Sequence, residues 1–261
     1  MTGRTRLGGI SIDCQTTDLP EAARFWAYAL GMEATPGGET FMRLGRLEGS
    51  PEGVLWNAEG LTVEVQRVSH TPRVHLDIEA EDVAAEVSRL ERLGATQTAA
   101  IEDWVVMRAP TGHGFCVVPW DDAPAATPHA QVEPGVRTHR SRLGVLVIDC
   151  QTDDLGPATS FWAAALGVSG AVDADGKYAV LAERRGYPKL LLQSVEHEPR
   201  VHIDLETDDQ EAEERRLRAI GCSRVARVKR WIVMEAPTGQ RFCLVKPQSA
   251  DFPGQAPVWE S

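Results

Sequence analysis

The pattern of hydrophobic and polar positions changes period several times along the chain, and the same order of changes occurs in each half. Apolar residues at helical spacing predict helices over 19–30 and 81–93, each followed by a glycine that favours a helix end. Short apolar runs predict strands around these helices, over 7–13, 41–44, 53–56, 61–68, 73–79, 104–108 and 114–118. The first half therefore has the predicted order β-α-β-β-β, twice.

The second half of the chain repeats the first. Ile-Asp-Cys-Gln-Thr occurs at 12–16 and again at 148–152, whereas Pro-Arg-Val-His occurs at 72–75 and again at 199–202. Further matching segments are Phe-Trp-Ala at 25–27 and 161–163, and Ala-Pro-Thr-Gly at 109–112 and 236–239. So many collinear matches indicate the duplication of a unit of about 120 residues, and such repeats decide the architecture.

Composition of the connecting segments predicts the domain boundaries. We expect one domain over 1–119 and a second over 141–247, joined by a linker over 120–140 that is rich in proline and lacks an apolar period. The tail over 248–261 contains two prolines and a glycine, which favours an arm on the surface. Two aromatic residues of this tail, Phe252 and Trp259, could dock on the body of the protein.

Charge and composition exclude several classes of protein. The net charge is −11 and no basic stripe is present, so nucleic acid is not an expected partner. No apolar run approaches the roughly 20 residues that span a bilayer, and the N-terminus lacks the apolar core of a secretory signal. Five cysteines in such a chain indicate free thiols, which predicts a cytoplasmic protein.

The duplicated β-α-β-β-β order resembles the vicinal oxygen chelate superfamily, which includes glyoxalase I, bleomycin-resistance proteins and extradiol dioxygenases. The motifs that carry this resemblance are Arg-Val-His-Leu-Asp at 73–77 and Ala-Pro-Thr-Gly-His-Gly-Phe-Cys at 109–116, with their repeats in the second half. They are typical of the glyoxalase-like domain group. The resemblance implies an α+β fold in which two βαβββ modules form a cupped, mostly antiparallel sheet around a small-molecule ligand.

The resemblance also implies where metal ligands would lie, namely on the first and last strand of each module. The first of these positions falls near Ser11 in one half and Val147 in the other, and neither residue is a usual metal ligand. The other three positions in each half are occupied by a glutamine, a histidine and a cysteine. They are Gln66, His75 and Cys116 in the first half and Gln193, His202 and Cys243 in the second. Because the amide is a weak ligand and the first position lacks one, we expect no cofactor and no metal, although a divalent ion would use these three residues.

The candidate catalytic residues are His75, Asp77 and Glu64. His75 and Asp77 are two residues apart and share one face of a strand, as do their equivalents His202 and Asp204. The pair could serve in acid–base chemistry, or it could be a buried polar pair that fixes strand register. Glu64 has only Leu191 as its equivalent, which points to the first half as the functional one.

The remaining candidates would bind the ligand rather than react with it. They are Gln66, Cys116, Trp104 and Trp56, with the second-half equivalents Gln193, His202, Asp204 and Cys243. Two functions remain open. One is an enzyme of lyase or isomerase type that acts on a small oxygenated organic molecule and is metal-independent or only weakly metal-dependent. The other is a protein that sequesters such a molecule, as bleomycin-resistance proteins do. The chain would act as a monomer, a pseudo-dimer by duplication, or as a homodimer, with no membrane partner.

Overall fold

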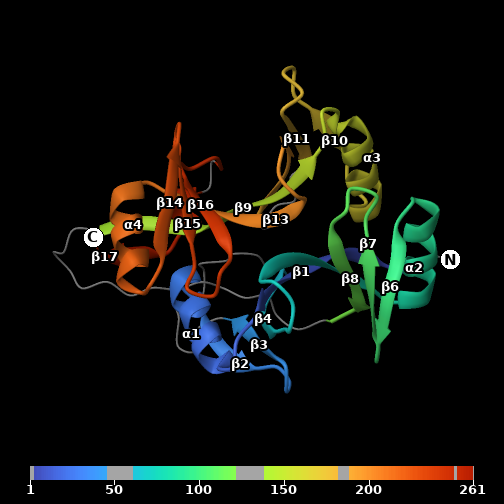
Figure 1. The fold of residues 1–261 in the computed structure, drawn as a ribbon, viewed down its shortest axis with the longest axis horizontal. Helices are drawn as coiled ribbons and strands as arrows, with labels where there is room; N and C mark the ends of the chain where they lie inside the picture. Colours follow the sequence, from blue (N-terminus) through green and yellow to red (C-terminus); the bar gives the residue numbers. More distant parts are fainter. Residues whose placement is uncertain (1–2, 46–60, 122–137, 182–187, 250–251, 261) are drawn as a thin grey trace.

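The computed structural model describes residues 3–45, 61–121, 138–181, 188–249 and 252–260. In the first half these residues form two βαβββ modules that are joined edge to edge (Figure 1). The elements are β1 (Thr5–Cys14), α1 (Leu19–Leu30), β2 (Glu33–Pro36), β3 (Phe41–Gly45), β4 (Thr62–Arg67), β5 (Arg73–Ala80), α2 (Val83–Arg92), β6 (Thr96–Ile101), β7 (Trp104–Arg108) and β8 (Gly114–Pro119). Both predicted helices are confirmed, β2 and β6 are additional, and the strand expected over 53–56 lies outside the described residues.

The second half forms the same two modules, which confirms the α+β class and the tandem duplication. Its elements are β9 (Thr138–Gln151), α3 (Leu155–Leu166), β10 (Gly170–Val172), β11 (Tyr178–Leu181), β12 (Lys189–Val195), β13 (Arg200–Thr207), α4 (Gln210–Ala219), β14 (Ser223–Val228), β15 (Trp231–Glu235) and β16 (Arg241–Val245). Strands β5 and β13 meet at Val74 and Val201, so the sheets of the two halves are continuous.

Strand register brings the candidate residues of the first half to the middle of its sheet. On β1, Ser11 lies opposite His75 of the antiparallel strand β5 and opposite Glu64 of the parallel strand β4. On β5, Asp77 lies opposite Cys116 of the parallel strand β8. Because residues that face each other across neighbouring strands project to the same side, these five side chains gather on one face.

The helices are set by the same local signals in both halves. The side chain of Asp18 accepts a hydrogen bond from the backbone N–H of Glu21 and so caps α1, while Asp154 caps α3 through Gly156. Gly31 ends α1 with a φ of 71°, a left-handed conformation that glycine adopts without a steric penalty. The apolar faces of both helices are thereby fixed at the start and end that the sequence predicts.

Each first helix packs its tryptophan against the other half of the chain. Trp26 of α1 is fully buried, its ring meets Phe242 of β16 at 5.9 Å edge to face, and its indole N–H donates to Thr238. Trp162 of α3 is fully buried in the same way and meets Phe115 of β8 at 5.7 Å. Figure 1 shows α1 beside the β14–β16 sheet and α3 beside β7 and β8. The two halves therefore share one hydrophobic core.

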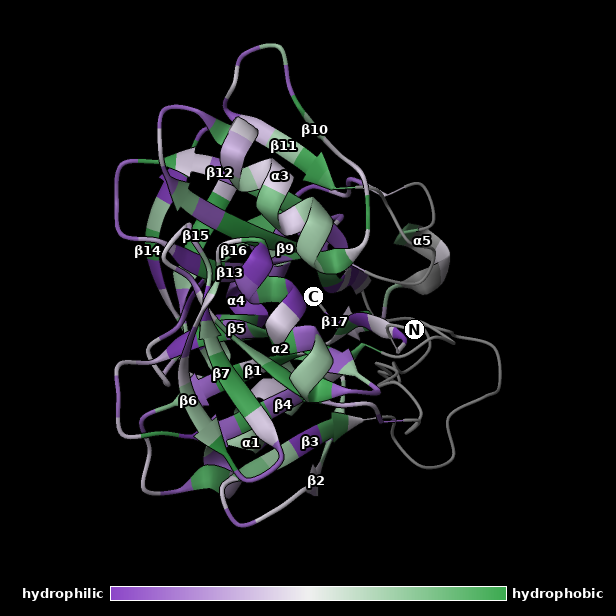
Figure 2. Ribbon diagram, turned by 90° about the vertical axis from the view of Figure 1, so that its right-hand side faces the viewer, coloured by the Kyte–Doolittle hydropathy of each residue, from purple (hydrophilic) through white to green (hydrophobic). Residues whose placement is uncertain are grey.

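The apolar residues of this core follow the strands. Figure 2 shows hydrophobic stretches along many of the strands, and helices in which hydrophobic and hydrophilic residues alternate. The hydrophobic effect favours the burial of such stretches, because burial of apolar area is its main source of stability. The functional side chains described below are polar exceptions on the inner sheet face.

A hairpin from each half also reaches the end of the first strand of the other half. Gln240, between β15 and β16, donates from Nε2 to the carbonyl oxygen of Asp13 at 2.6 Å. His113, its equivalent between β7 and β8, donates from Nε2 to the carbonyl oxygens of Asp149 and Arg200 at 3.0 and 3.2 Å. The two halves thus support each other's strand ends with one amide and one imidazole.

His113 makes the stability of this contact depend on pH. Burial lowers the pKa of His113, because removal from water disfavours the charged imidazole, although the hydrogen bonds to the carbonyl oxygens of Arg200 and Asp149 oppose the fall. The unfolded chain takes up a proton near its ordinary pKa and the folded chain does not, so this group destabilises the fold as the pH falls below that value. The effect is limited to one proton, or about 1.4 kcal/mol per pH unit.

We expect His113→Gln to lose less stability than the wild type between pH 7 and pH 5.5. Gln240 shows that an amide can make the same contact in this fold, so the variant should remain folded. The measurement is the free energy of unfolding in urea at both pH values. An equal loss of stability in the two proteins would contradict the assignment of this pH dependence to His113.

Of the segments outside the two repeats, the linker is shorter than expected, and the tail follows the alternative in which Phe252 and Trp259 dock. Strand β9 begins at Thr138, inside the segment that we expected to be linker, and 122–137 lie outside the described residues. The tail is docked on the body of the protein, with Phe252 and Trp259 buried, through the short helix α5 (Phe252–Gln255) and strand β17 (Val258–Glu260), which pairs with β9. Trp259 stacks on the guanidinium of Arg216, which binds the last carbonyl groups of α1.

Two expectations about environment are also addressed by the structure. No helix among the described residues is long and apolar enough to cross a membrane. All five cysteines are free and buried: Cys14, Cys116, Cys150, Cys222 and Cys243. The prediction of free thiols rather than a disulfide framework is therefore in agreement with the structure.

Candidate functional site

A cavity of about 670 Å³ opens on the inner face of the first-half sheet. Its floor comes from the central strands, and its walls come from β3, β7 and the segment that follows β8. Most residues that we singled out in the first half line it: Glu64, Gln66, His75, Asp77, Trp104 and Cys116. Trp56, the remaining candidate, lies outside the described residues. The volume suits a small organic molecule.

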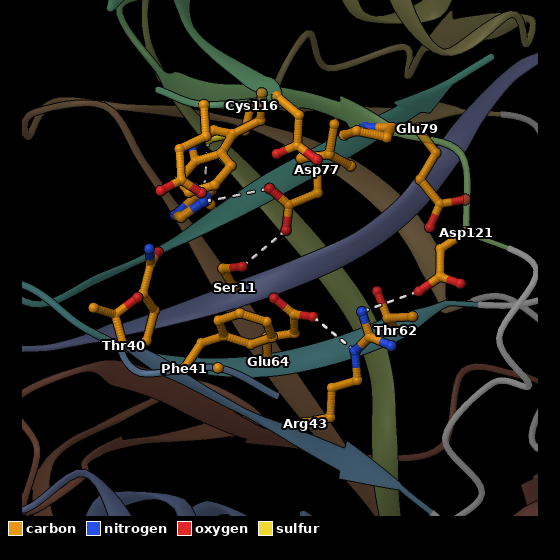
Figure 3. A pocket seen from close by; sticks show the side chains of 18 of the residues that line it. Ser11, Thr40, Phe41, Arg43, Thr62, Glu64, Asp77, Glu79, Cys116 and Asp121 are labelled. Carbon is orange, nitrogen blue, oxygen red and sulfur yellow. Dashed lines mark hydrogen bonds and ion pairs between the residues drawn. The ribbon is translucent and has the colours of Figure 1, made fainter. Parts of the chain in front are cut away.

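His75, Asp77 and Cys116 form a cluster at the floor of this cavity. One ligand atom of each residue lies within 4.8 Å of the others. Nε2 of His75 is 3.4 Å from Oδ1 of Asp77 and 3.6 Å from Sγ of Cys116. Ser11 donates a hydrogen bond of 2.8 Å to the other carboxylate oxygen of Asp77 (Figure 3). A nitrogen, an oxygen and a sulfur atom therefore converge on one point.

The orientation of His75 is fixed by Asp13, a residue that the sequence analysis missed. Nδ1 of His75 lies 3.1 Å from Oδ2 of Asp13, and Arg73 donates to the same oxygen at 2.8 Å. A histidine whose Nδ1–H is held by a carboxylate presents its other nitrogen in a fixed direction, as in carboxylate–histidine–metal arrangements. The signal was present in the sequence, because Asp13 shares a strand face with Ser11 and is repeated as Asp149.

The cluster places positive charge between its acceptor atoms. While the imidazole of His75 is protonated, Nδ1 faces Asp13 and Nε2 faces Asp77 at 3.4 Å; loss of the second proton leaves a lone pair on Nε2 beside the lone pairs of Asp77. Burial lowers the pKa of His75, but the charge of Asp77 and hydrogen bonds to Asp13 and Asp77 raise it well above the usual value. The cluster therefore holds a proton strongly, and the same lone pairs suit a divalent ion of borderline softness.

The second half keeps the cluster but changes its surroundings. His202, Asp204 and Cys243 gather in the same way, and Asp149 lies 3.0 Å from Nδ1 of His202. Val147 replaces Ser11, and the buried Oδ1 of Asp204 lies 3.3 Å from Nε2 of His202, as Oδ1 of Asp77 lies beside His75. A buried carboxylate is costly unless a cation lies beside it, and a protonated imidazole or a metal ion can fill that role. The donor set of both clusters thus fits a divalent metal ion.

Glu64 gives the first-half cavity a further titratable group beside the cluster. Arg43 of β3 binds Glu64 at 3.1 Å and Asp121 at 3.0 Å, so one guanidinium joins the floor to the far wall (Figure 3). Burial and the charge of Asp77 raise the pKa of Glu64, although the hydrogen bond from Arg43 opposes the rise. In the second half Val180 and Leu191 occupy these positions in the same register.

The cysteines of the two clusters are both buried. Cys116 lies in the first cluster and lines the cavity. Burial raises the pKa of Cys243 in the second cluster, although a hydrogen bond to His202 opposes the rise. Gln193 lies opposite Tyr178 and Gln66 lies opposite Phe41, so each of the two glutamines has an aromatic residue as its neighbour on the adjacent strand.

Comparison with known proteins agrees with this geometry. The family model described as "Glyoxalase-like domain" matches residues 9–118 and again residues 145–245. The chain belongs to the glyoxalase-like domain family. Each matched segment of this glyoxalase-like protein contains one His-Asp-Cys cluster of its own. The match of both segments to this family confirms the resemblance to the vicinal oxygen chelate superfamily. Among curated proteins, no sequence matches the chain significantly.

Solved structures share the fold of this glyoxalase-like protein over nearly its whole length. The 2,3-dioxygenase LapB from Pseudomonas sp. KL28 has a TM-score of 0.58 at 14% identity and covers 95% of this chain and 93% of its own. The Mn(II)-bound glyoxalase from Novosphingobium aromaticivorans has a TM-score of 0.58 at 15% identity, covering 98% and 86%. A catechol 2,3-dioxygenase has a TM-score of 0.56 at 15% identity, covering 96% and 91%.

The expectation that the protein needs no cofactor is wrong. It rested on Gln66 as a weak ligand and on the lack of a ligand near Ser11, and it left Asp77 out of the ligand count. The structure places Asp77 with His75 and Cys116, which gives two anionic-type ligands and one imidazole, and a solved structure with the same fold is bound to Mn(II). The donor set therefore points to a metal cofactor.

Proposed function

We propose that the first half of this glyoxalase-like protein is a metal-dependent enzyme that moves a proton on a small oxygenated organic molecule. The observation that carries this proposal is one cavity that contains both a cluster of metal-ligand type and a separate carboxyl group with a raised pKa. The reaction class is that of an isomerase or lyase, since such reactions begin by removal of a proton beside an oxygen-bearing carbon.

His75, Asp77 and Cys116 would hold the ion, and the rest of the first half supports them. Asp13 fixes the imidazole, and Ser11 fixes the carboxylate of Asp77. Support of this kind is typical of metal sites, where outer residues orient the ligands. When bound, a divalent ion would polarise an oxygen atom of the organic molecule and so make an adjacent C–H bond more acidic.

Glu64 would accept and return the proton. Its carboxyl group lies beside the cluster, it lines the cavity, and its raised pKa brings it closer to the range in which a carboxylate is an effective base. Arg43 holds this carboxyl in place from the wall and balances its charge. The flanking aromatic and apolar lining residues, among them Phe41 and Trp104, would exclude water from the reacting carbon.

The second half is proposed to lack this chemistry. Leu191 stands where Glu64 would accept a proton, and Val180 stands where Arg43 would hold it. In addition, Arg241 replaces Gly114 on the neighbouring strand β16. A cluster that can hold an ion therefore remains, without the group that would transfer a proton.

The test is exchange of deuterium into hydroxyacetone, a small neutral molecule with two adjacent oxygen atoms. Zinc-loaded wild-type protein in D₂O should catalyse the exchange, followed by NMR, and Glu64→Gln should reduce the rate at least 100-fold, the usual contribution of a positioned base. Glu91→Gln, which removes an exposed carboxylate of α2 outside the cavity, should leave the rate unchanged. The absence of exchange in the wild type, or equal rates in wild type and Glu64→Gln, would contradict the proposal.

A further inference from the structure

The lining of the first-half cavity is strongly acidic. Seven of its twenty lining residues are carboxylates, whereas one is an arginine. Several of these carboxylates are already neutralised: Arg43 binds Glu64 and Asp121, and Arg6 binds Glu79 at 2.7 Å. Three others lie at the exposed edge, and among the described residues no ion pair neutralises them: Glu39, Glu102 and Asp103. Arg67 donates to the backbone carbonyl of Glu39 at 3.3 Å, so within the described part of the chain the negative charge without a nearby arginine is that of Glu102 and Asp103.

Two of these edge residues form a turn whose equivalent carries the opposite charge. Glu102 and Asp103 connect β6 to β7, and Lys229 and Arg230 connect β14 to β15 in the second half. The backbone is the same in both turns, since φ is 51° at Glu102 and 52° at Lys229. The turn itself therefore tolerates either charge, so the acidic pair is not needed to form it.

The metal-type clusters do not explain the acidic entrance either. The second half keeps His202, Asp204 and Cys243 together, and its equivalent turn carries two basic residues. The cluster and the charge of this turn therefore vary independently in one chain. What the acidic turn can change is the potential at the cavity entrance, which selects among ligands by their charge.

A tryptophan lies beside the acidic turn. Trp104 follows Asp103 directly, opens β7, and lines the same cavity in a half-buried position. Carboxylates next to an aromatic ring are a combination that attracts alkylammonium groups, through opposite charge and through the negative face of the ring. This pair of features is independent of the cluster on the cavity floor.

We propose that the first-half cavity takes a small oxygenated molecule that carries a protonated amine, with the amine at the entrance near Glu102, Asp103 and Trp104. This inference rests on the proposed function of the cavity and names the class of its substrate. The oxygen atoms of the molecule lie toward His75, Asp77 and Cys116, and the cationic group lies toward the acidic turn. An anionic molecule of the same size is disfavoured.

The test compares three catechols of different charge as binding probes. Dopamine is a cation at neutral pH, 4-methylcatechol is neutral, and 3,4-dihydroxyphenylacetate is an anion, while all three carry the same two adjacent oxygen atoms. Isothermal titration of zinc-loaded protein, without oxygen and at low salt, should show that dopamine binds about tenfold more tightly than the anion, with the neutral probe between them. The preference should shrink at high salt, because these charges are exposed.

A double variant gives the first-half turn the two basic residues that the second-half turn carries. Glu102→Lys combined with Asp103→Arg should weaken dopamine binding about fivefold, strengthen binding of the anion, and leave the neutral probe unchanged. The matched control, Lys229→Glu combined with Arg230→Asp, changes the same positions of the other half and should alter none of the three affinities. Both turns already exist in this fold, so both variants should remain folded.

The outcomes separate this inference from the proposed function. If the three probes bind the wild type with equal affinity, the inference about charge is overturned while the cavity remains a site for adjacent oxygen atoms. If none of the three binds while the protein still exchanges deuterium into hydroxyacetone, the inference about the substrate class is overturned and the proposed function stands. If dopamine is preferred but the first-half double variant keeps that preference, the acidic turn is not its source and the placement of the amine is overturned.

Discussion

Replacing Trp26 by alanine should lower the free energy of unfolding by about 3–5 kcal/mol, the range for removal of a large aromatic side chain from a core. Trp26 is fully buried, packs edge to face against Phe242 of the other half, and donates to Thr238. The substitution therefore removes a core contact and a hydrogen bond that join the two halves. The measurement is denaturation in urea, monitored by circular dichroism.

Two further variants serve as controls for the role of Trp26. Trp26→Phe keeps an aromatic ring and should cost clearly less than alanine. Trp162→Ala removes the equivalent ring and should cost about as much as Trp26→Ala, since Trp162 is equally buried against Phe115. Because the halves share one core, each alanine variant should unfold in one transition. Two separate transitions in the wild type would contradict a shared core.

Replacing His75 by alanine should abolish zinc-dependent exchange into hydroxyacetone, with a fall of at least 100-fold in rate. His75 is the imidazole of the first-half cluster, and Asp13 fixes it toward Asp77 and Cys116. Loss of one of three ligands weakens the hold on the ion, and loss of an outer residue alone typically costs 10–100-fold in metal affinity or activity. The rate in D₂O, measured by NMR at a fixed concentration of zinc, checks this prediction.

His202→Ala is the matched control for His75→Ala. The two histidines are buried alike, with exposed fractions of 4% and 5%. Each is held by an aspartate on the first strand of its own half, Asp13 on β1 or Asp149 on β9. The structural penalty of the two variants should therefore be similar, and melting temperatures would show it. Exchange should persist in His202→Ala. Equal loss of exchange in both variants would indicate two equivalent sites, and loss only in His202→Ala would place the function in the other half.

The local structure of this protein follows closely from its sequence. Helix α1 was predicted over 19–30 because its apolar residues recur at helical spacing and a glycine follows, and the structure has the same bounds. Strands β2 and β6 were missed because they are short, mostly exposed, and carry no apolar alternation, as in Thr-Gln-Thr-Ala-Ala-Ile. Their formation depends on pairing with β3 and β7, which is a tertiary effect.

The candidate site is predictable only where it depends on local spacing along one strand. His75 and Asp77 were placed together because residues two apart on a strand share a face. Their proximity to Cys116 and Glu64 depends on the register between strands, which spacing along the chain does not define. The support that Gln240 gives to Asp13 from the opposite half depends on how the halves pack, and no local pattern encodes that.

The error about the cofactor has the same origin. The ligand count took one residue from each strand position that the family resemblance implied and therefore did not include Asp77, which is two residues from His75. A carboxylate next to an imidazole and a thiol changes the expected affinity for a divalent ion, since it adds a charged ligand to the set. Only the fold shows that all three groups reach one point.

The position of a bound ion tests the account most directly. Crystals of the zinc-loaded protein, measured at the zinc absorption edge, should show an anomalous peak on the floor of the first-half cavity. The peak should lie about 2.0–2.2 Å from a nitrogen of His75 and an oxygen of Asp77, and about 2.3 Å from the sulfur of Cys116, the usual zinc distances. An empty first-half cluster at saturating zinc, or a peak held by other residues of the cavity, would contradict the account.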